Sequence, residues 1–164
     1  MNSNAPAPLP RSPFAANLFE GKHAFITGGG TGLGLEISRR LASLGAHVTI
    51  ASRSASHHAA FLDEAKANDW SASAFELDVR KMADIADLVK KLRENGPIDI
   101  LVNNAAGNFV CPAERLSEGA WRAVLGIVLD GTFFCSREFG KGMIQDGGGV
   151  ILKERGSVVG ITTA

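Results

Sequence analysis

Short apolar runs alternate with amphipathic helical patterns along most of the chain. In the helical stretches, apolar residues recur three and four positions apart, and two of these stretches end at glycines, Gly45 and Gly96, which suit the position after a helix. A more polar helix is predicted over residues 56–67, and a longer one follows Ser117. The runs that are typical of buried strands are residues 23–27, 46–51, 74–79, 98–103 and 157–162.

This alternation predicts an α/β fold: a doubly wound, Rossmann-like parallel sheet of about five strands with helices on both faces. Four of the six prolines lie in the first 13 residues, so we expect residues 1–17 to form a flexible tail and residues 18–164 to form the domain. Residues 145–160 are irregular and hold a second strand-like piece, residues 149–152. The sheet is expected to be incomplete at its C-terminal side.

Composition narrows the function classes. The 17 basic and 17 acidic side chains balance, which argues against a nucleic-acid partner. We also expect no membrane partner, because no apolar stretch reaches the ~18 residues that a membrane span requires. Cys111 and Cys135 match no zinc spacing, so no metal site is expected. Reduced thiols and the lack of a recognisable signal predict a cytoplasmic location, with an organelle as the alternative.

The most informative motif is TGGGTGLG, which lies between a strand and an amphipathic helix. Glycines at such a turn let the backbone approach a pyrophosphate, and the N–H groups at the start of the helix face the anion. The spacing is G-x-x-x-G-x-G rather than G-x-G-x-x-G, so the strand–loop–helix context carries the prediction. The expected cofactor-binding residues in this loop are Gly28, Gly29, Gly30, Thr31, Gly32, Leu33 and Gly34.

Polar residues at later strand ends extend the predicted cofactor site. Arg53 stands where an acidic residue usually binds the ribose of NAD, which favours the 2′-phosphate of NADP; the alternative is a solvated arginine. Asp78 could accept a hydrogen bond from the adenine amino group or be a turn residue. After the fourth strand, small residues such as Ala105 let the backbone pass close to a cofactor, while Asn103 and Asn104 can tie neighbouring strand ends together.

Two other features of the sequence are not assigned to the predicted cofactor site. His57 and His58 lie in a polar stretch and are expected to be surface residues far from the strand ends. The apolar stripe Leu125, Leu129 and Phe133 is interpreted as core or as a subunit contact.

Together these residues resemble the short-chain dehydrogenase/reductase family, through TGGGTGLG, Asp78-Val79 and NNAAG. FEGKHAFITGGGTGLG, IASR, LDVR, NNAAGNF, ERLS and VLDGTFF are similar to 2,4-dienoyl-CoA reductases in particular. That resemblance implies an NADPH-dependent reductase of acyl-CoA thioesters in fatty acid oxidation, homo-oligomeric in its full-length form. It also implies a cofactor site that includes Arg53 and Asp78, a thioester carbonyl bound by Asn108, and an acyl-CoA site lined by Phe109, Arg80 and Ser117.

The chain departs from the family pattern in its catalytic residues. The family's Tyr-x-x-x-Lys follows the fifth strand, whereas this chain has no tyrosine and ends at Ala164. Asp130 is a weak candidate for the family's polar residue on the long helix. We therefore expect this chain alone to be inactive. The alternatives are a non-catalytic nucleotide-binding chain, or a 3-oxoacyl or other carbonyl reductase of the same family.

Overall fold

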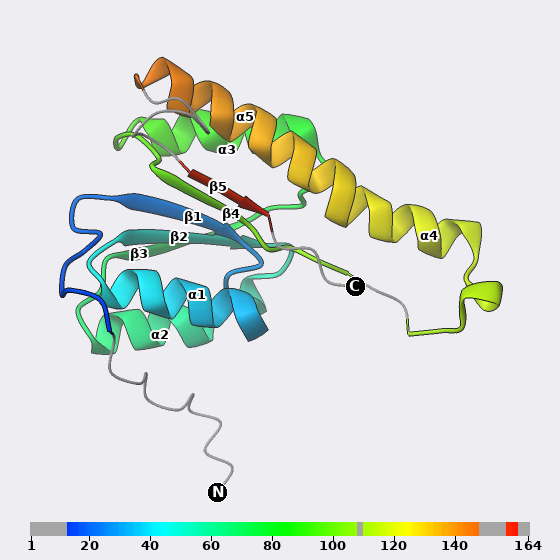
Figure 1. Ribbon diagram of the computed structural model, residues 1–164, viewed down its shortest axis with the longest axis horizontal. Coiled ribbons are helices and arrows are strands. Elements are labelled where there is room, and N and C mark those ends of the chain that lie inside the picture. Colours follow the sequence, from blue (N-terminus) through cyan, green and yellow to red (C-terminus); the bar gives the residue numbers. More distant parts are fainter. Residues whose placement is uncertain (1–12, 108–109, 148–156, 161–164) are drawn as a thin grey trace, which may run out of the picture.

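A five-stranded, all-parallel sheet with the strand order β3-β2-β1-β4-β5 forms the centre of the molecule (Figure 1). The computed structural model describes residues 13–107, 110–147 and 157–160. This arrangement confirms the predicted α/β fold and doubly wound sheet. The strands are β1 (His23–Thr27), β2 (His47–Ser52), β3 (Ala72–Glu76), β4 (Ile100–Asn103) and β5 (Ser157–Gly160).

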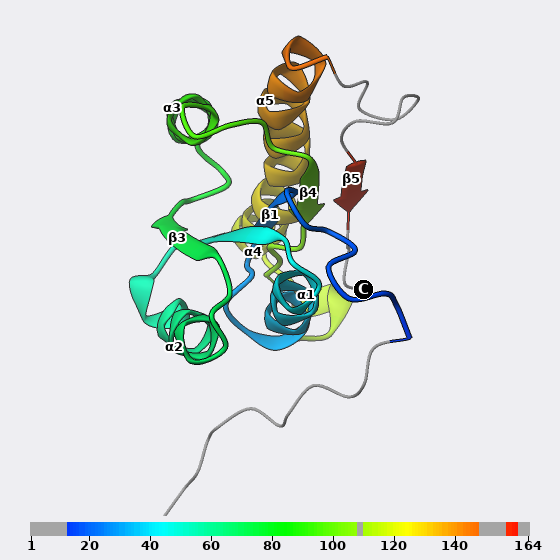
Figure 2. The same ribbon diagram turned by 90° about the vertical axis from the view of Figure 1, so that its left-hand side faces the viewer.

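The helices cover both faces of this sheet, with α1 and α2 on one side and α3 and α5 on the other (Figure 2). From β1 the chain moves outward through β2 to β3 and then returns to place β4 on the other side of β1. Ligands of doubly wound proteins bind where the strand order reverses in this way. The helices are α1 (Gly32–Ser43), α2 (Ala59–Ala67), α3 (Met82–Arg93), α4 (Glu118–Leu125) and α5 (Gly131–Gln145), with short 3₁₀ turns at Ala55–His57 and Ala113–Arg115.

Alternating strand side chains build two separate cores. Ala24 and Ile26 of β1 face α1 and α2, whereas Phe25 faces α3 and α5. The Phe25 ring packs against Phe139 of α5, with 4.4 Å between the ring centroids. Because the strands are covered on both faces, they have the nearly continuous apolar character that made them recognisable in the sequence.

The predicted third strand, residues 74–79, is wrong at both ends. β3 covers Ala72–Glu76, and Asp78 lies in the loop that follows it. Leu77 and Val79 are nonetheless buried in the α3–α5 core, so the alternation of apolar and polar residues continues after the strand pairing has stopped. The expected strand-like piece at residues 149–152 and most of the expected tail, residues 1–12, lie outside the described residues.

Helices α4 and α5 are joined by a π-helical turn, Gly126–Asp130. Leu129 and Phe133 are 61% and 60% exposed, so the interpretation of their stripe as core is wrong; a subunit contact stays a prediction. A π turn takes more residues than an α-helical turn, and this changes which side chains of the helix face the sheet. Among the helices of the described residues, none is long and apolar enough to cross a membrane.

Candidate functional site

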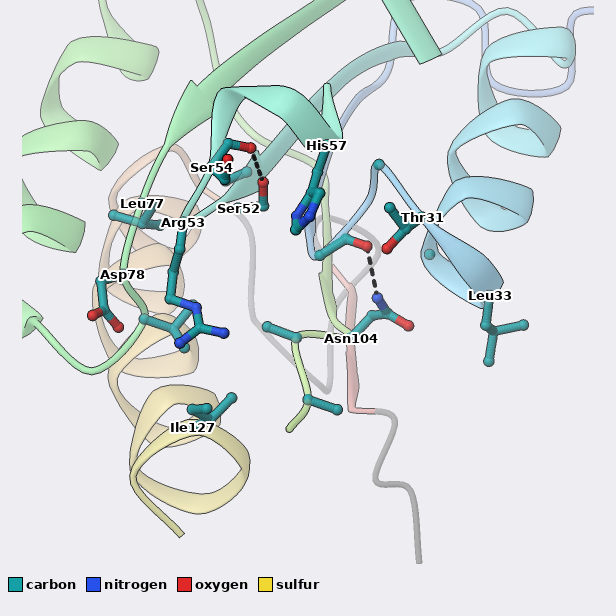
Figure 3. A pocket seen from close by; sticks show the side chains of 17 residues that line it. Thr31, Leu33, Ser52, Arg53, Ser54, His57, Leu77, Asp78, Asn104 and Ile127 are labelled. Carbon is teal, nitrogen blue, oxygen red and sulfur yellow. Dashed lines mark hydrogen bonds between the residues drawn. The ribbon is translucent and has the colours of Figure 1, made fainter. Parts of the chain in front are cut away.

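A pocket of about 560 Å³ lies at the carboxyl edge of the sheet, where the strand order reverses (Figure 3). Its wall is formed by the β1–α1 loop, by the segments after β2, β3 and β4, and by the π turn before α5. A pocket of this size can enclose a large part of a nucleotide. Of the predicted loop residues, Gly28, Gly30, Thr31, Leu33 and Gly34 line it, and Gly29 and Gly32 complete the same turn.

Close backbone approach explains the glycines of this loop. Gly28 has a φ of +68°, a conformation that other residues rarely adopt. A Cβ atom on Gly30 would overlap the carbonyl oxygen of His57, and one on Gly34 would overlap the carbonyl oxygen of Gly28 and the side-chain nitrogen of Asn104. The loop is therefore packed between the β2–α2 connection and the end of β4, with its backbone facing the pocket.

The amino end of α1 is open to the pocket. Thr31 occupies the N-cap position, but its side chain forms no capping hydrogen bond, and the first turn carries no acidic side chain. The first N–H groups of a helix have no partner within the helix and lie at the positive end of its dipole. The start of α4 differs, with Ser117 as its cap and Glu118 in its first turn. Because the uncapped start of α1 lines the pocket, it is suited to a phosphate there.

Asn104 joins the Gly-rich loop to the end of β4. Its Nδ2 donates hydrogen bonds to the carbonyl oxygens of Thr27 (3.0 Å) and Gly28 (3.1 Å). The backbone N–H groups of Asn104 and Ala105 both donate to the hydroxyl of Thr27, each at 3.0 Å. The prediction that asparagines tie neighbouring strand ends together is thus confirmed for Asn104, whereas Asn103 donates from Nδ2 to the hydroxyl of Ser136 on α5 (3.0 Å).

Asp78 and Arg80 form a close ion pair beside the pocket. Arg80 donates from Nη2 to Asp78 Oδ2 (2.5 Å) and from Nε to Oδ1 (2.9 Å). These hydrogen bonds lower the pKa of Asp78 to about 2, against an opposing effect of burial. Asp78 lines the pocket as an acceptor that is charged near neutral pH, which suits the amino group of an adenine. Arg80 is exposed and is not among the residues that line the pocket; its side chain passes close to Gly126 of the π turn.

The β2–α2 connection brings the predicted Arg53 to the pocket together with Ser54 and His57, which the sequence did not indicate as site residues. His58 is only 6% exposed, its Nε2 lies 2.9 Å from the hydroxyl of Ser52, and burial lowers its pKa. His57 is exposed, as expected, but it lines the pocket at the strand ends. The expectation is thus wrong for the exposure of His58 and for the distance of His57 from the site, because the connection folds back over the end of β2. A cap at Ser54, whose hydroxyl accepts from the Ser56 N–H, is the one local signal for that turn.

Ile127 of the π turn is another lining residue that the sequence did not indicate. Asp130, the last residue of the π turn, is exposed and does not line the pocket. Ser117 is exposed and caps α4 by accepting a hydrogen bond from the Ala120 N–H (3.2 Å). Asn108 and Phe109 lie outside the described residues.

Within residues 13–107, 110–147 and 157–160, no group of three or more His, Cys, Asp or Glu side chains could hold a metal ion.

Comparison with known proteins now adds to this geometry. A family model described as short chain dehydrogenase matches residues 22–162. The chain belongs to the short-chain dehydrogenase family. It is 42% identical to a Bacillus subtilis protein named as a probable 2,4-dienoyl-CoA reductase, over 81% of this chain and 53% of that protein. It is also 42% identical to a peroxisomal 2,4-dienoyl-CoA reductase of Pongo abelii, over 88% of this chain and 50% of that protein. The chain thus spans about half the length of the curated relatives it matches.

Solved structures support the same family and its cofactor class. A gluconate 5-dehydrogenase of Burkholderia cenocepacia, crystallised with NADP and tartrate, superimposes with a TM-score of 0.73 at 31% identity, over 79% of this chain and 51% of that one. Membership of the family implies a nicotinamide dinucleotide cofactor. The residues present fit such a group, because the open end of α1, the close-packed glycines and the Asp78 carboxylate all face one pocket.

Proposed function

We propose that this chain is the cofactor-binding part of an NADPH-dependent reductase that acts on 2,4-dienoyl-CoA thioesters. The observation that supports the assignment of NADPH as the cofactor is the position of Arg53 in a pocket whose other parts suit a dinucleotide. The observation that favours the substrate class is the NNAAGNF stretch together with relatives at about 40% identity that bear the name 2,4-dienoyl-CoA reductase.

Arg53 favours NADPH over NADH. It follows β2 directly, extends into the pocket, and stands where an acidic residue would bind the ribose hydroxyls of NAD (Figure 3). A guanidinium can bind a phosphate through two parallel hydrogen bonds, which a hydroxyl cannot match. Neutralising Arg53 should therefore weaken NADPH binding far more than NADH binding.

Each part of the pocket has a role in this proposal. The N–H groups at the start of α1 bind the pyrophosphate, Asp78 accepts from the adenine amino group, and Asn104 holds the loop against β4. The bound NADPH supplies a hydride. By resemblance, Asn108 donates to the thioester carbonyl, while Phe109, Arg80 and Ser117 lie along the acyl-CoA.

The position of the final double bond depends on where the substrate is protonated. Hydride addition at the far end of the diene leaves an electron pair that is delocalised onto the thioester oxygen, where a hydrogen-bond donor stabilises it. A proton taken up next to the thioester leaves a 3-enoyl product, and one taken up two carbons further along leaves a 2-enoyl product. The relatives include proteins named for each product.

The test is NADPH oxidation by the full-length protein that carries this chain, with a 2,4-dienoyl-CoA and a 3-oxoacyl-CoA as competing substrates. We expect turnover of the dienoyl thioester and a single enoyl product, identified by mass spectrometry and NMR. Turnover of the 3-oxoacyl thioester alone would overturn the substrate assignment and favour a ketoreductase of the same family.

A second candidate function is nucleotide binding without hydride transfer. It is favoured by the absence of tyrosine from the 164 residues, since the chain itself offers no phenol for proton transfer. NADPH fluorescence titration of the 164-residue chain, followed by an oxidation assay, separates the two functions. We expect binding without turnover; measurable reduction of a thioester by this chain would contradict that expectation.

A further inference from the structure

We propose that His23 and His47 form a binding site for a divalent transition-metal ion of the Zn²⁺ class at the amino edge of the sheet. The two residues are paired in register across β1 and β2, with 4.6 Å between their ring centroids. Both line a second cavity of about 560 Å³. The proposal is independent of the proposed function, because none of the described residues lines both this cavity and the candidate cofactor pocket.

Polar side chains floor this cavity where the sheet face is otherwise apolar. Phe25, two residues after His23 on the same face of β1, belongs to the α3–α5 core. Thr49 pairs with Phe25 across β1 and β2, and with Ser73 across β2 and β3. Strands that are covered on both faces are usually apolar throughout, and Thr49 is fully buried. A buried polar cluster in such a sheet is therefore the feature that calls for a function.

The two imidazoles face the same hydroxyl group. Thr49 Oγ1 lies 2.8 Å from Nε2 of His23 and 3.4 Å from Nε2 of His47. Ser73 Oγ lies 2.7 Å from Thr49 Oγ1 and 3.3 Å from Nε2 of His47. The other ring nitrogen of His47, Nδ1, lies 2.6 Å from the hydroxyl of Ser71. Imidazoles that bind metals are usually held by a hydrogen bond at their second nitrogen, and the His47 ring is held in this way.

The donor atoms select the class of ion. Imidazole nitrogens suit Zn²⁺, Cu²⁺ and Ni²⁺, whereas Mg²⁺ and Ca²⁺ prefer carboxylate oxygens. Among the described residues that line the cavity there is no carboxylate. Burial lowers the pKa of His23 to about 4 and also lowers the pKa of His47, so both rings are neutral near pH 7. A metal ion binds the neutral form of imidazole, so it displaces no proton here.

The nearest charges leave room for a cation. Lys22 is the one formally charged side chain among the described residues that line the cavity, and its ammonium group is paired with Asp99 (3.0 Å). Asp99 also accepts a hydrogen bond from the backbone N–H of His23 (2.9 Å), so a carboxylate lies beside the site. Lys91 of α3 lies over the ring of Phe75, 5.1 Å from its centroid, and does not line the cavity.

An ion between the two rings takes two nitrogen ligands from the chain. Zn²⁺ binds imidazole nitrogen at about 2.0–2.1 Å and prefers four ligands in a tetrahedron. The hydroxyls of Thr49 and Ser73 lie beside the Nε2 atoms and supply oxygen, directly or through a bound water. Two imidazoles are fewer than the ligands of most structural zinc sites, so we expect weaker binding than in those sites. The bound ion joins β1 to β2 and therefore stabilises the folded chain.

The test is a titration of the 164-residue chain, without a histidine tag, with Zn²⁺ in competition with a chromophoric chelator. We expect one ion per chain and binding that is at least about tenfold weaker in His23→Gln and in His47→Gln, because loss of a residue that merely supports a ligand already costs about 10- to 100-fold. The matched control is His57→Gln, which removes an exposed imidazole at the opposite edge of the sheet and should leave Zn²⁺ affinity unchanged. Circular dichroism shows whether each variant is folded.

Cu²⁺ provides a readout on the unaltered chain, since it binds such ligands more tightly than Zn²⁺ does. Its electron paramagnetic resonance spectrum should show coupling to two imidazole nitrogens, and to one in His23→Gln and in His47→Gln. Zn²⁺ should also raise the urea midpoint of the unaltered chain and leave that of His47→Gln unchanged.

Three results would overturn the metal site. The first is no Zn²⁺ binding, which would show that the cluster is satisfied by its own hydrogen bonds. The second is binding that persists in both His23→Gln and His47→Gln or is lost in His57→Gln. The third is a Cu²⁺ spectrum without coupling to two imidazole nitrogens. Each of these leaves the proposed NADPH-dependent function as it stands, because the two cavities share no residue among those described.

Discussion

Asn104 shows how much of the site depends on one side chain. Its amide bridges two backbone carbonyl groups of the β1–α1 loop, and its own N–H is bound by the Thr27 hydroxyl. NNAAG was recognisable in the sequence because the ends of parallel strands meet at one edge of the sheet. His57 was not, because its place depends on how the β2–α2 connection folds back.

We expect Asn104→Ala to lower the free energy of unfolding by about 1–3 kcal/mol, because the carbonyl groups of Thr27 and Gly28 lose their donor in a partly buried place. NADPH affinity should fall as well, since the loop is no longer held against β4. Urea unfolding and fluorescence titration measure the two effects. The matched control is Asn68→Ala, which removes an exposed hydrogen bond to the Glu64 carbonyl (2.8 Å). Equal losses in both variants would contradict the assigned role.

At the scale of elements, an almost fully buried arginine joins α1 to α2. Arg39 donates from Nε to Glu64 Oε1 (2.9 Å) and from Nη1 to Glu36 Oε1 (2.6 Å), and its side chain is 3% exposed. Helical periodicity predicted α1, since it reports which face of a helix is apolar, whereas α2 was expected as a polar helix over residues 56–67 and begins at Ala59. It did not predict this ion pair, because a polar residue on the boundary of that face gives no sign of its partner on another helix.

We expect Arg39→Met to lower the free energy of unfolding by about 3 kcal/mol, because it leaves the largely buried Glu64 carboxylate without its counter-ion. The control is Arg122→Met, which breaks the pair with Glu118 between side chains that are 75% and 76% exposed. Surface pairs contribute little, so this variant should change stability by no more than about 0.5 kcal/mol. Chemical denaturation measures both, and similar values for the two variants would refute the assignment.

At the scale of the whole molecule, the edge of the sheet opposite the pocket contains a second polar cluster. His23 and His47 are partners across β1 and β2, with 4.6 Å between ring centroids. Burial lowers the pKa of His23 to about 4, with His47 adding to the effect and Asp99 opposing it; burial also lowers the pKa of His47. These imidazoles resist protonation in the folded chain and accept it in the unfolded one.

The free energy of unfolding should therefore fall as the pH is lowered from about 6.5 to about 4, because the unfolded state then binds more protons. Asp78, whose pKa is lowered from 3.8 to about 2, decreases the free energy of unfolding further only when the pH falls below about 3.8. Urea unfolding should show that the free energy of unfolding decreases by about 1–2 kcal/mol between about pH 6.5 and about pH 4. The decrease should be smaller in His23→Gln. Because desolvation is the main cause, the decrease should persist at high salt; its disappearance there would argue for surface charge instead.

The fold class, the Gly-rich loop and the tie at Asn104 could all be predicted from the order of the amino acids. The spacing of apolar residues shows which side of each helix or strand is buried, and a run of glycines shows where the backbone must be closely packed. Parallel strands also bring their carboxyl ends to one edge of the sheet, so the residues that follow them lie close together. The folded structure was needed to show that His57 and Ile127 line the pocket and that His58 is buried. Those features depend on the path of the β2–α2 connection and on a π turn, and the pattern of single residues along a chain does not encode where such segments meet.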